Sequence, residues 1–293
     1  MAGTKEIRRR LASVRSTRKI TSAMKLVSAA KLRRAQDSVT RSRAYTTALN
    51  ELLAELRAEA AGLDMIHPLM EARVPAKRAL VIVIGGSRGL CGAYNGNIGK
   101  RIESLARERA GQETQWLLIG RKPGEHCRRV GREYLKSYEE LPEDANRWPV
   151  DEFAADAERA FLNGEVDEVF VLYARFKSAM SMTVTLDQIL PLGSKDLGAD
   201  DAKPTVSGLT IFEPSVQELF AAVLPRIVRS KLRQAGLDAK ASEYASRMTA
   251  MESATKNAGD LAKKLQLTYN KVRQSGITSE LLDIIGGAEA IKG

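Results

Sequence analysis

Apolar and small residues recur at regular steps along the C-terminal part of the chain. The steps between successive positions alternate between three and four, a period of about 3.5 residues, which is typical of a helix in a left-handed coiled coil. The positions are Met248, Met251, Thr255, Ala258, Ala262, Leu265, Tyr269 and Val272. A helix with one such seam cannot bury it alone, so the pattern predicts a second long helix beside it.

The N-terminal part of the chain supplies that helix. Residues 4–61 contain neither Gly nor Pro and predict a single helix, roughly 85 Å long. Its apolar residues form three stripes that move around the helix axis, so the helix could contact more than one partner. A plain two-helix coiled coil with a solvated basic face is the alternative. The stripes are Ile7, Leu11 and Val14, then Ile20, Ala23, Val27 and Ala30, and then Leu49, Leu52, Leu53 and Leu56.

Between the two helices the pattern changes to short apolar runs that alternate with helical segments. Strands are expected over Ala79–Ile84, Trp116–Ile119, Val166–Arg175 and Ser181–Leu186, the last as a hairpin partner. Helices are expected over residues 95–109, 124–130 and 150–162. This alternation predicts a Rossmann-like α/β domain.

The last helix is expected to begin at Phe212–Ser215, after an exposed loop rich in Gly, Asp and Pro. Pro225 should kink or break it, and Gly236 should add a second irregularity. The predicted fold class is therefore a long antiparallel left-handed coiled coil of the N- and C-terminal helices together with a Rossmann-like α/β domain. The three segments cover residues 1–61, 76–192 and 209–290.

The net charge of +10 is concentrated at the N-terminus. Residues 1–43 contain thirteen Lys and Arg but only Glu6 and Asp37 as acids, so the remainder of the chain is nearly neutral. A coiled coil that binds nucleic acid or an anionic membrane is one interpretation. Against it, the basic residues fall on all sides of the helix, and Tyr45 is the first aromatic residue.

A glycine-rich loop, Gly85–Gly92, follows the first predicted strand. Phosphates and dinucleotides often bind at such a place, so a nucleotide-binding enzyme is a further alternative. The loop, however, matches neither common phosphate-binding motif. His67 and His126 have no companion catalytic motif, and Cys91 and Cys127 complete no metal-ligand set. We therefore expect a non-enzymatic chain without cofactor or metal.

Six motifs taken together resemble the gamma subunit of F-type ATP synthases, in the family's order and nearly end to end. They are Ala2–Arg8, Lys19–Met24, Arg88–Gly92, Arg247–Met251, Leu265–Lys271 and Ile277–Glu280 through Ala288. The resemblance implies a rotor shaft, one copy per complex, that transmits torque between a membrane c-ring and a catalytic ring of alpha and beta subunits. It also implies contact with an epsilon subunit, ATP chemistry on the beta subunits, and no nucleic acid.

The resemblance also implies contact residues. Six match positions at or near the alpha/beta ring: Met24, Arg247, Arg273, Gln274, Thr278 and Glu280. Phe212 and Glu213 match the region over the c-ring and epsilon subunit, and Leu281–Ile285 matches a sliding apolar tip. The first motif follows Met1 directly, which favours a bacterial protein on the cytoplasmic face of the plasma membrane. The regulatory cysteine insert of chloroplast relatives is missing, so no thiol switch is expected.

Overall fold

The computed structural model describes residues 3–59, 67–193, 213 and 215–292. The elements are, in order, α1 (Thr4–Glu59), η1 (Pro68–Met70), β1 (Arg78–Ile84), α2 (Tyr94–Glu108), β2 (Glu113–Ile119), α3 (Arg121–Arg129), β3 (Lys136–Tyr138), η2 (Ala145–Arg147), α4 (Val150–Leu162), β4 (Glu168–Ser178), β5 (Ser181–Leu190) and α5 (Val216–Lys292). The contacts divide the chain into two compact units. We call residues 1–29 with 247–293 the coil unit, and residues 30–246 the sheet unit.

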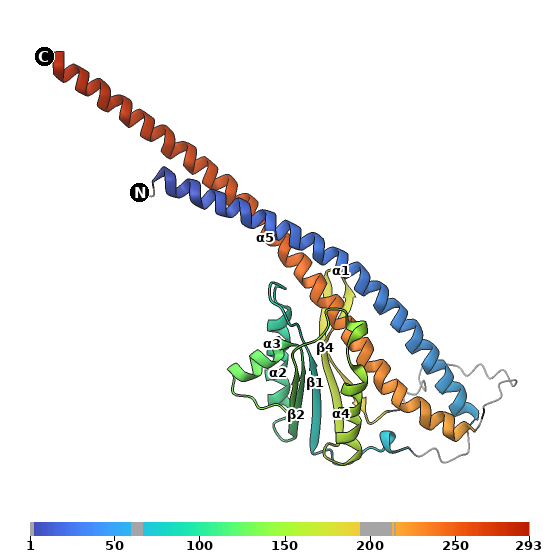
Figure 1. The fold of residues 1–293 in the computed structure, drawn as a ribbon. Helices are drawn as coiled ribbons and strands as arrows, with labels where there is room; N and C mark the ends of the chain where they lie inside the picture. Colours follow the sequence, from blue (N-terminus) through green and yellow to red (C-terminus); the bar gives the residue numbers. More distant parts are fainter. Residues whose placement is uncertain (1–2, 60–66, 194–212, 214, 293) are drawn as a thin grey trace. The chain divides into compact units, whose positions relative to one another are not determined.

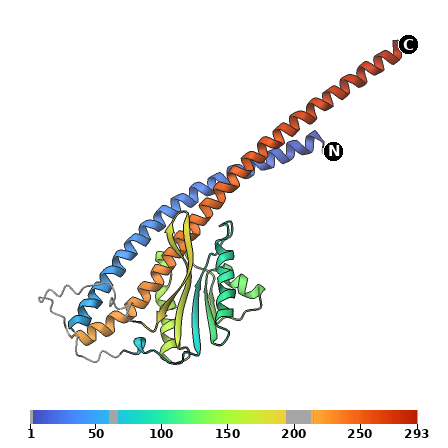
Figure 2. The ribbon, with the colours of Figure 1, turned by 180° about the vertical axis from the view of Figure 1, so that it is seen from behind.

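Both long helices are shared between the units, whereas the sequence interpretation divided the chain at helix ends. The division into residues 1–61, 76–192 and 209–290 therefore stays a prediction. Within each unit, segments of α1 and α5 run side by side (Figures 1 and 2). Their contacts run antiparallel, since Arg15 bonds Gln266 while Lys25 bonds Glu252.

The sheet unit contains one five-stranded sheet in the order β3-β2-β1-β4-β5. The first four strands in that order are parallel, and β5 pairs antiparallel with β4. Helices α2 and α4 lie on opposite faces of the sheet (Figure 1). Residues 79–84 of β1 are at most 1% exposed, because both faces are covered. This explains why β1 appears in the sequence as an unbroken apolar run, and it confirms the predicted Rossmann-like class.

One strand was missed. β3 has three residues and pairs with Leu117–Ile119 at the sheet edge. Its sequence has no alternating apolar pattern, so the neighbouring strand rather than local preference holds it in place. Gly120 follows the end of β2, and its φ of 97° strongly favours glycine. A Cβ there would also lie 2.4 Å from the Gly85 carbonyl oxygen.

The predicted beginning of α5 is wrong, and so is a break of the helix at Pro225. The helix begins at Val216 rather than at Phe212–Ser215, because the Ser215 hydroxyl accepts a hydrogen bond from the Glu218 backbone N–H and caps the first turn. Pro225 lies inside the helix and does not break it, while the kink predicted there as the other outcome stays a prediction. Gly236 is helical as well, and its lack of a side chain lets Trp148 pack closely, since a Cβ would lie 3.1 Å from the indole ring.

Candidate functional site: the helical coil and the glycine-rich loop

The C-terminal seam lies where the period predicted it. Met251 and Ala258 are 5% and 9% exposed. The other six seam residues are half-buried, and most residues between them are exposed. In the coil unit, α5 therefore turns a narrow stripe toward α1, which confirms the predicted coiled-coil packing.

The α1 side of this seam mixes apolar and polar residues. Ile7 and Leu11 are both 5% exposed. Further along, Thr21 and Lys25 reach polar partners on α5. The Thr255 hydroxyl donates to Thr21 Oγ1 at 2.8 Å, and Lys25 Nζ donates to Glu252 Oε1 at 2.6 Å. Polar pairs thus add to the apolar packing in the middle of the coil.

The second predicted stripe of α1 is not part of the seam. Ile20 and Val27 are 58% and 53% exposed, and Leu26 beside them is 67% exposed. Ala23 and Ala30 are exposed as well. This stripe lies outside the contact between α1 and α5, so it is an uncovered apolar surface of the kind that marks interaction sites.

The predicted contact residues fall into separate groups. Met24 is half-buried, and its neighbour Lys25 pairs with Glu252 on α5. Arg247 is 9% exposed, so most of its side chain already contacts this chain. Arg273, Gln274, Thr278 and Glu280 are all exposed. Because Arg273 lies 21 residues beyond Glu252, the structure separates this group from Met24 by roughly 30 Å along the helix.

The remaining predicted contacts concern the residues before α5. Glu213 is exposed, whereas Phe212 lies outside the described residues. The predicted loop before α5 lies outside them from residue 194 onward.

The end of α5 has no cover in this chain. Residues 273–287 are helical and exposed all round the helix. Five large apolar side chains there are between 50% and 67% exposed: Ile277, Leu281, Leu282, Ile284 and Ile285. A helix with uncovered apolar residues on several faces indicates a binding partner.

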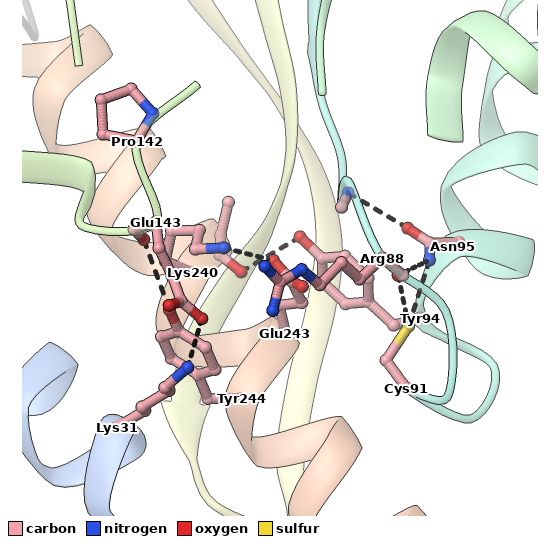
Figure 3. A network of polar contacts seen from close by, with 12 residues as sticks. Lys31, Arg88, Cys91, Tyr94, Asn95, Pro142, Glu143, Lys240, Glu243 and Tyr244 are labelled. Atoms are coloured by element: carbon pink, nitrogen blue, oxygen red, sulfur yellow. Dashed lines mark hydrogen bonds and ion pairs between the residues drawn. The ribbon is translucent and has the colours of Figure 1, made fainter. Parts of the chain in front are cut away.

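The sheet unit presents a second exposed feature, the glycine-rich loop between β1 and α2 (Figure 3). The Asn95 amide holds the loop by donating to the Arg88 carbonyl at 3.2 Å, and its Oδ1 accepts from the Gly86 N–H at 3.1 Å. The Ser246 hydroxyl on α5 donates to the Cys91 carbonyl at 2.6 Å. These bonds fix Leu90 with a positive φ of 59° and 62% exposure. An exposed leucine with a strained backbone, in a loop held by hydrogen bonds, is a candidate contact residue for a partner protein.

A buried ion pair lies behind this loop. Lys240 and Glu243 on α5 are joined at 2.8 Å, with side chains 13% and 3% exposed. Nearby, Lys31 pairs with Glu143, and this hydrogen bond lowers the pKa of the Glu143 carboxyl. The Tyr244 hydroxyl donates to the Glu143 backbone carbonyl at 3.3 Å (Figure 3).

The arrangement disfavours a phosphate at the loop. The N–H groups of Gly85 and Gly86 already bond to Ile119 and Asn95. The Glu243 carboxyl carbon would lie 3.4 Å from a Cβ at Gly86, so a carboxylate lies where a phosphate would need cations. The geometry therefore argues against the nucleotide-binding alternative.

The two cysteines and the acidic and histidine side chains were the candidates for thiol chemistry and metal binding. Cys91 and Cys127 are both buried thiols that form no disulfide, and burial raises the pKa of Cys127. Among the described residues, no group of three or more His, Cys, Asp or Glu side chains could hold a metal ion. No helix in the same part is long and apolar enough to cross a membrane.

Asp238 on α5 provides a pH prediction. Burial raises the pKa of its carboxyl, while the Arg43 guanidinium, hydrogen bonded to it at 3.2 Å, opposes this rise. A raised folded-state pKa means that stability is lost as the pH rises through it. Asp238→Asn should therefore be more stable than wild type at pH 7, with the advantage vanishing below the ordinary value of 3.8. Urea unfolding of both proteins, from pH 7 to below pH 3.8, measures this difference in the free energy of unfolding. The exposed control Asp260→Asn should change the free energy of unfolding at pH 7 by no more than about 0.5 kcal/mol. An advantage of Asp238→Asn that persists at low pH would contradict the assignment.

Sequence reasoning missed several of these residues. Glu243 and Lys240 are spaced i, i+3 on a helix, which by itself indicates only a possible surface pair. Leu90 carries no signal for a positive φ, because leucine rarely adopts one. The RGLCG segment did mark the loop, but its exposed side chain could not be identified without the tertiary contacts.

The fold and these surfaces define a class of protein. Two long helices form a coil with an uncovered tip, and an α/β domain presents a tethered loop, so the chain is built to assemble with other subunits. A family model described as ATP synthase matches residues 3–291. ATP synthase gamma chains of Anaeromyxobacter sp. (strain K) and Geotalea uraniireducens are each 41% identical to it, and that of Chlorobium phaeobacteroides is 37% identical, all over the full length of both chains. The chain belongs to the ATP synthase gamma chain family.

Solved structures agree on the fold. A chain of the Euglena gracilis mitochondrial ATP synthase, from a structure of OSCP, F1 and the c-ring, superposes with a TM-score of 0.63 at 22% identity, covering 98% of this chain and 94% of that one. A chain from the central stalk and c-ring of the Tetrahymena thermophila enzyme gives 0.57 at 23% identity, covering 80% and 99%.

Proposed function

We propose that this chain is the central-stalk rotor subunit of an F-type ATP synthase. It transmits torque between the membrane c-ring and the catalytic ring of alpha and beta subunits, and so couples proton flow to ATP synthesis or hydrolysis. The end-to-end similarity to gamma chains carries the proposal. The exposed tip of α5 supports it, because apolar contacts are non-directional and allow a helix to turn inside a ring.

The chain itself is non-catalytic in this proposal, and the catalytic sites lie on the beta subunits. One copy contacts the alpha and beta subunits, the epsilon subunit and the c-ring at the cytoplasmic face of a bacterial plasma membrane. Met24, Arg247, Arg273, Gln274, Thr278 and Glu280 lie at or near the alpha/beta ring, and Phe212 and Glu213 lie near the c-ring and epsilon subunit.

The exposed groups near the tip are suited to transient contacts. Arg273 and Glu280 are exposed charges on α5. Exposed ion pairs contribute only about 0.2–1 kcal/mol each, so such pairs with a surrounding ring can form and break at each step of rotation. A bearing and a torque-transmitting contact can therefore coexist on one helix.

Met24→Lys tests this role. The half-buried side chain would carry a charge into the proposed contact, so proton pumping per ATP hydrolysed should fall severalfold, as about 1 kcal/mol of unfavourable contact energy implies. Proton pumping and ATP hydrolysis are measured together in membrane vesicles that contain the assembled complex.

Met180→Lys is the matched control, because Met180 is 93% exposed at the turn between β4 and β5. It should pump protons as wild type does. If the Met24 variant pumps as many protons per ATP hydrolysed as wild type, Met24 does not lie at the contact with the alpha/beta ring. A purified membrane complex with any stoichiometry other than one copy of this chain to three alpha and three beta subunits would contradict the rotor role itself.

A further inference from the structure

We propose that an arginine-lined groove in the sheet unit docks an acidic segment of a partner polypeptide. The groove has a volume of about 440 Å³ and lies between α1, α5 and the beginning of α4. Four guanidinium groups line it: Arg41 from α1, and Arg226, Arg229 and Arg233 from α5. The inference stands on the chemistry of the groove and does not rest on the rotor role.

The groove is strongly positive. Asp151 is the acidic side chain among the described residues that line it. Its carboxylate pairs with Arg229 Nε at 3.3 Å and is 80% exposed, so solvent screens the pair. Within the described part of the chain, Arg226 and Arg233 have no ion pair. Arg41 has none in that part either, so among the described residues three of the four arginines lack a carboxylate partner, and a ligand with several carboxylates can supply them.

The spacing of these arginines indicates a ligand that carries more than one negative charge. Arg226 and Arg233 lie seven residues apart, roughly 10 Å along the helix, with Arg229 between them on the same face. A single phosphate or carboxylate cannot reach both ends of this row. Carboxylates on a polypeptide can, because alternate residues of an extended strand point the same way at a spacing of roughly 6.6–6.8 Å.

The shape of the groove disfavours a membrane as the ligand. Arg229 and Arg233 are half-buried, whereas Arg41, Tyr45 and Arg226 are exposed. A flat lipid surface would reach the exposed groups but would not enter between the helices. A polypeptide segment can enter and present side chains to both walls.

The residue types also match a protein interface. Arg and Tyr, together with Trp, are the residues most enriched at the energetic centres of such interfaces, and planar guanidinium groups bind carboxylates through two parallel hydrogen bonds. Tyr45, 53% exposed, adds an aromatic surface next to the arginines. The partner chemistry is thus an acidic segment with two or more carboxylates on one side.

Binding of a fluorescein-labelled decaglutamate peptide to the full-length chain tests the proposal, measured by fluorescence anisotropy at about 0.15 M salt, where exposed charges are screened beyond about 8 Å. The groove variant is Arg226→Gln with Arg233→Gln, which leaves the Arg229–Asp151 pair intact. Loss of two guanidinium–carboxylate contacts should weaken binding about tenfold.

The control is Arg8→Gln with Arg9→Gln, which removes two exposed charges from the basic run of α1. It should change the affinity by less than about threefold. Equal weakening by the two double variants would mean diffuse electrostatic attraction and would overturn the proposal, as would wild-type affinity in the groove variant. Circular dichroism melting curves that match wild type establish that both variants are folded.

Two further probes separate the ligand classes. Inorganic pyrophosphate and vesicles containing phosphatidylserine should compete only weakly with the peptide. If either binds more tightly than decaglutamate and loses that binding in the groove variant, the groove is a phosphate or lipid site, and the polypeptide proposal is wrong.

Discussion

Replacing Glu243 with Ala should lower the free energy of unfolding by about 3–5 kcal/mol. The carboxylate is buried behind the glycine-rich loop and bonds Lys240 at 2.8 Å. Lys240 is itself only 13% exposed, so the variant leaves a buried ammonium group without this partner. Urea denaturation followed by circular dichroism measures the loss. The free energy lost is large because the remaining charge cannot regain its hydration without opening the structure.

Glu252→Ala is the matched control, since it removes the same kind of ion pair from the same helix. Lys25 and Glu252 approach to 2.6 Å, but their side chains are 37% and 59% exposed. That change should cost no more than about 1 kcal/mol. Similar losses in the two variants would mean that burial does not decide the strength of these pairs. A double change of Lys240→Met with Glu243→Leu should recover much of the lost stability, because it removes both charges of the buried pair.

Leu53→Ala should lower the free energy of unfolding by about 2–5 kcal/mol. Leu53 is fully buried in the sheet unit, where α1 lies beside α5. Removing its side chain creates a cavity in addition to losing apolar contact, and a helix-packed site can collapse only partly around it. Denaturant unfolding of the full-length chain measures the effect.

Leu52→Ala controls for the change in residue type. Leu52 is the preceding residue on the same helix and is 37% exposed. Its replacement should change stability by no more than about 0.5 kcal/mol, because Ala is a good helix former and little apolar area is re-exposed. A loss as large as that of Leu53→Ala would show that the burial of these neighbours is wrongly assigned.

The contrast between Leu52 and Leu53 shows that the sequence pattern can identify an apolar stripe but not which of two neighbouring residues is buried. The apolar stripe of α1 included both residues, since a stripe wide enough to face a helix partner covers neighbouring positions. Which of them is buried depends on the path of α5 and on the elements packed around it. The same limit applies to Ile20 and Val27, which were assigned to a stripe and prove to be exposed.

Polar residues in the contact between α1 and α5 are a second feature that the sequence pattern could not predict. Thr21 and Lys25 occupy contact positions of α1, but no hydrophobic pattern can identify them. Their partners, Thr255 and Glu252, are 234 and 227 residues away in the sequence. Such contacts depend on the antiparallel register of two helices, and the register becomes known only when both are placed.

What the sequence by itself determined is the set of elements with strong periodic signals. The seam of α5, the strands β1, β2 and β4, and the helices around them follow from local spacing, because burial against one neighbour or under two layers leaves a regular apolar pattern. The end-to-end motifs also determined the family. Each of these signals lies within a continuous stretch of chain.

Only the tertiary structure decided the buried pair of Lys240 and Glu243, the positive φ of Leu90 and the groove of Arg41 with the three arginines of α5. In each case the decisive groups are distant in sequence, or are ordinary surface residues until another element covers them. Burial, strain and charge convergence are properties of neighbouring surfaces, and a chain acquires them only when distant segments pack together.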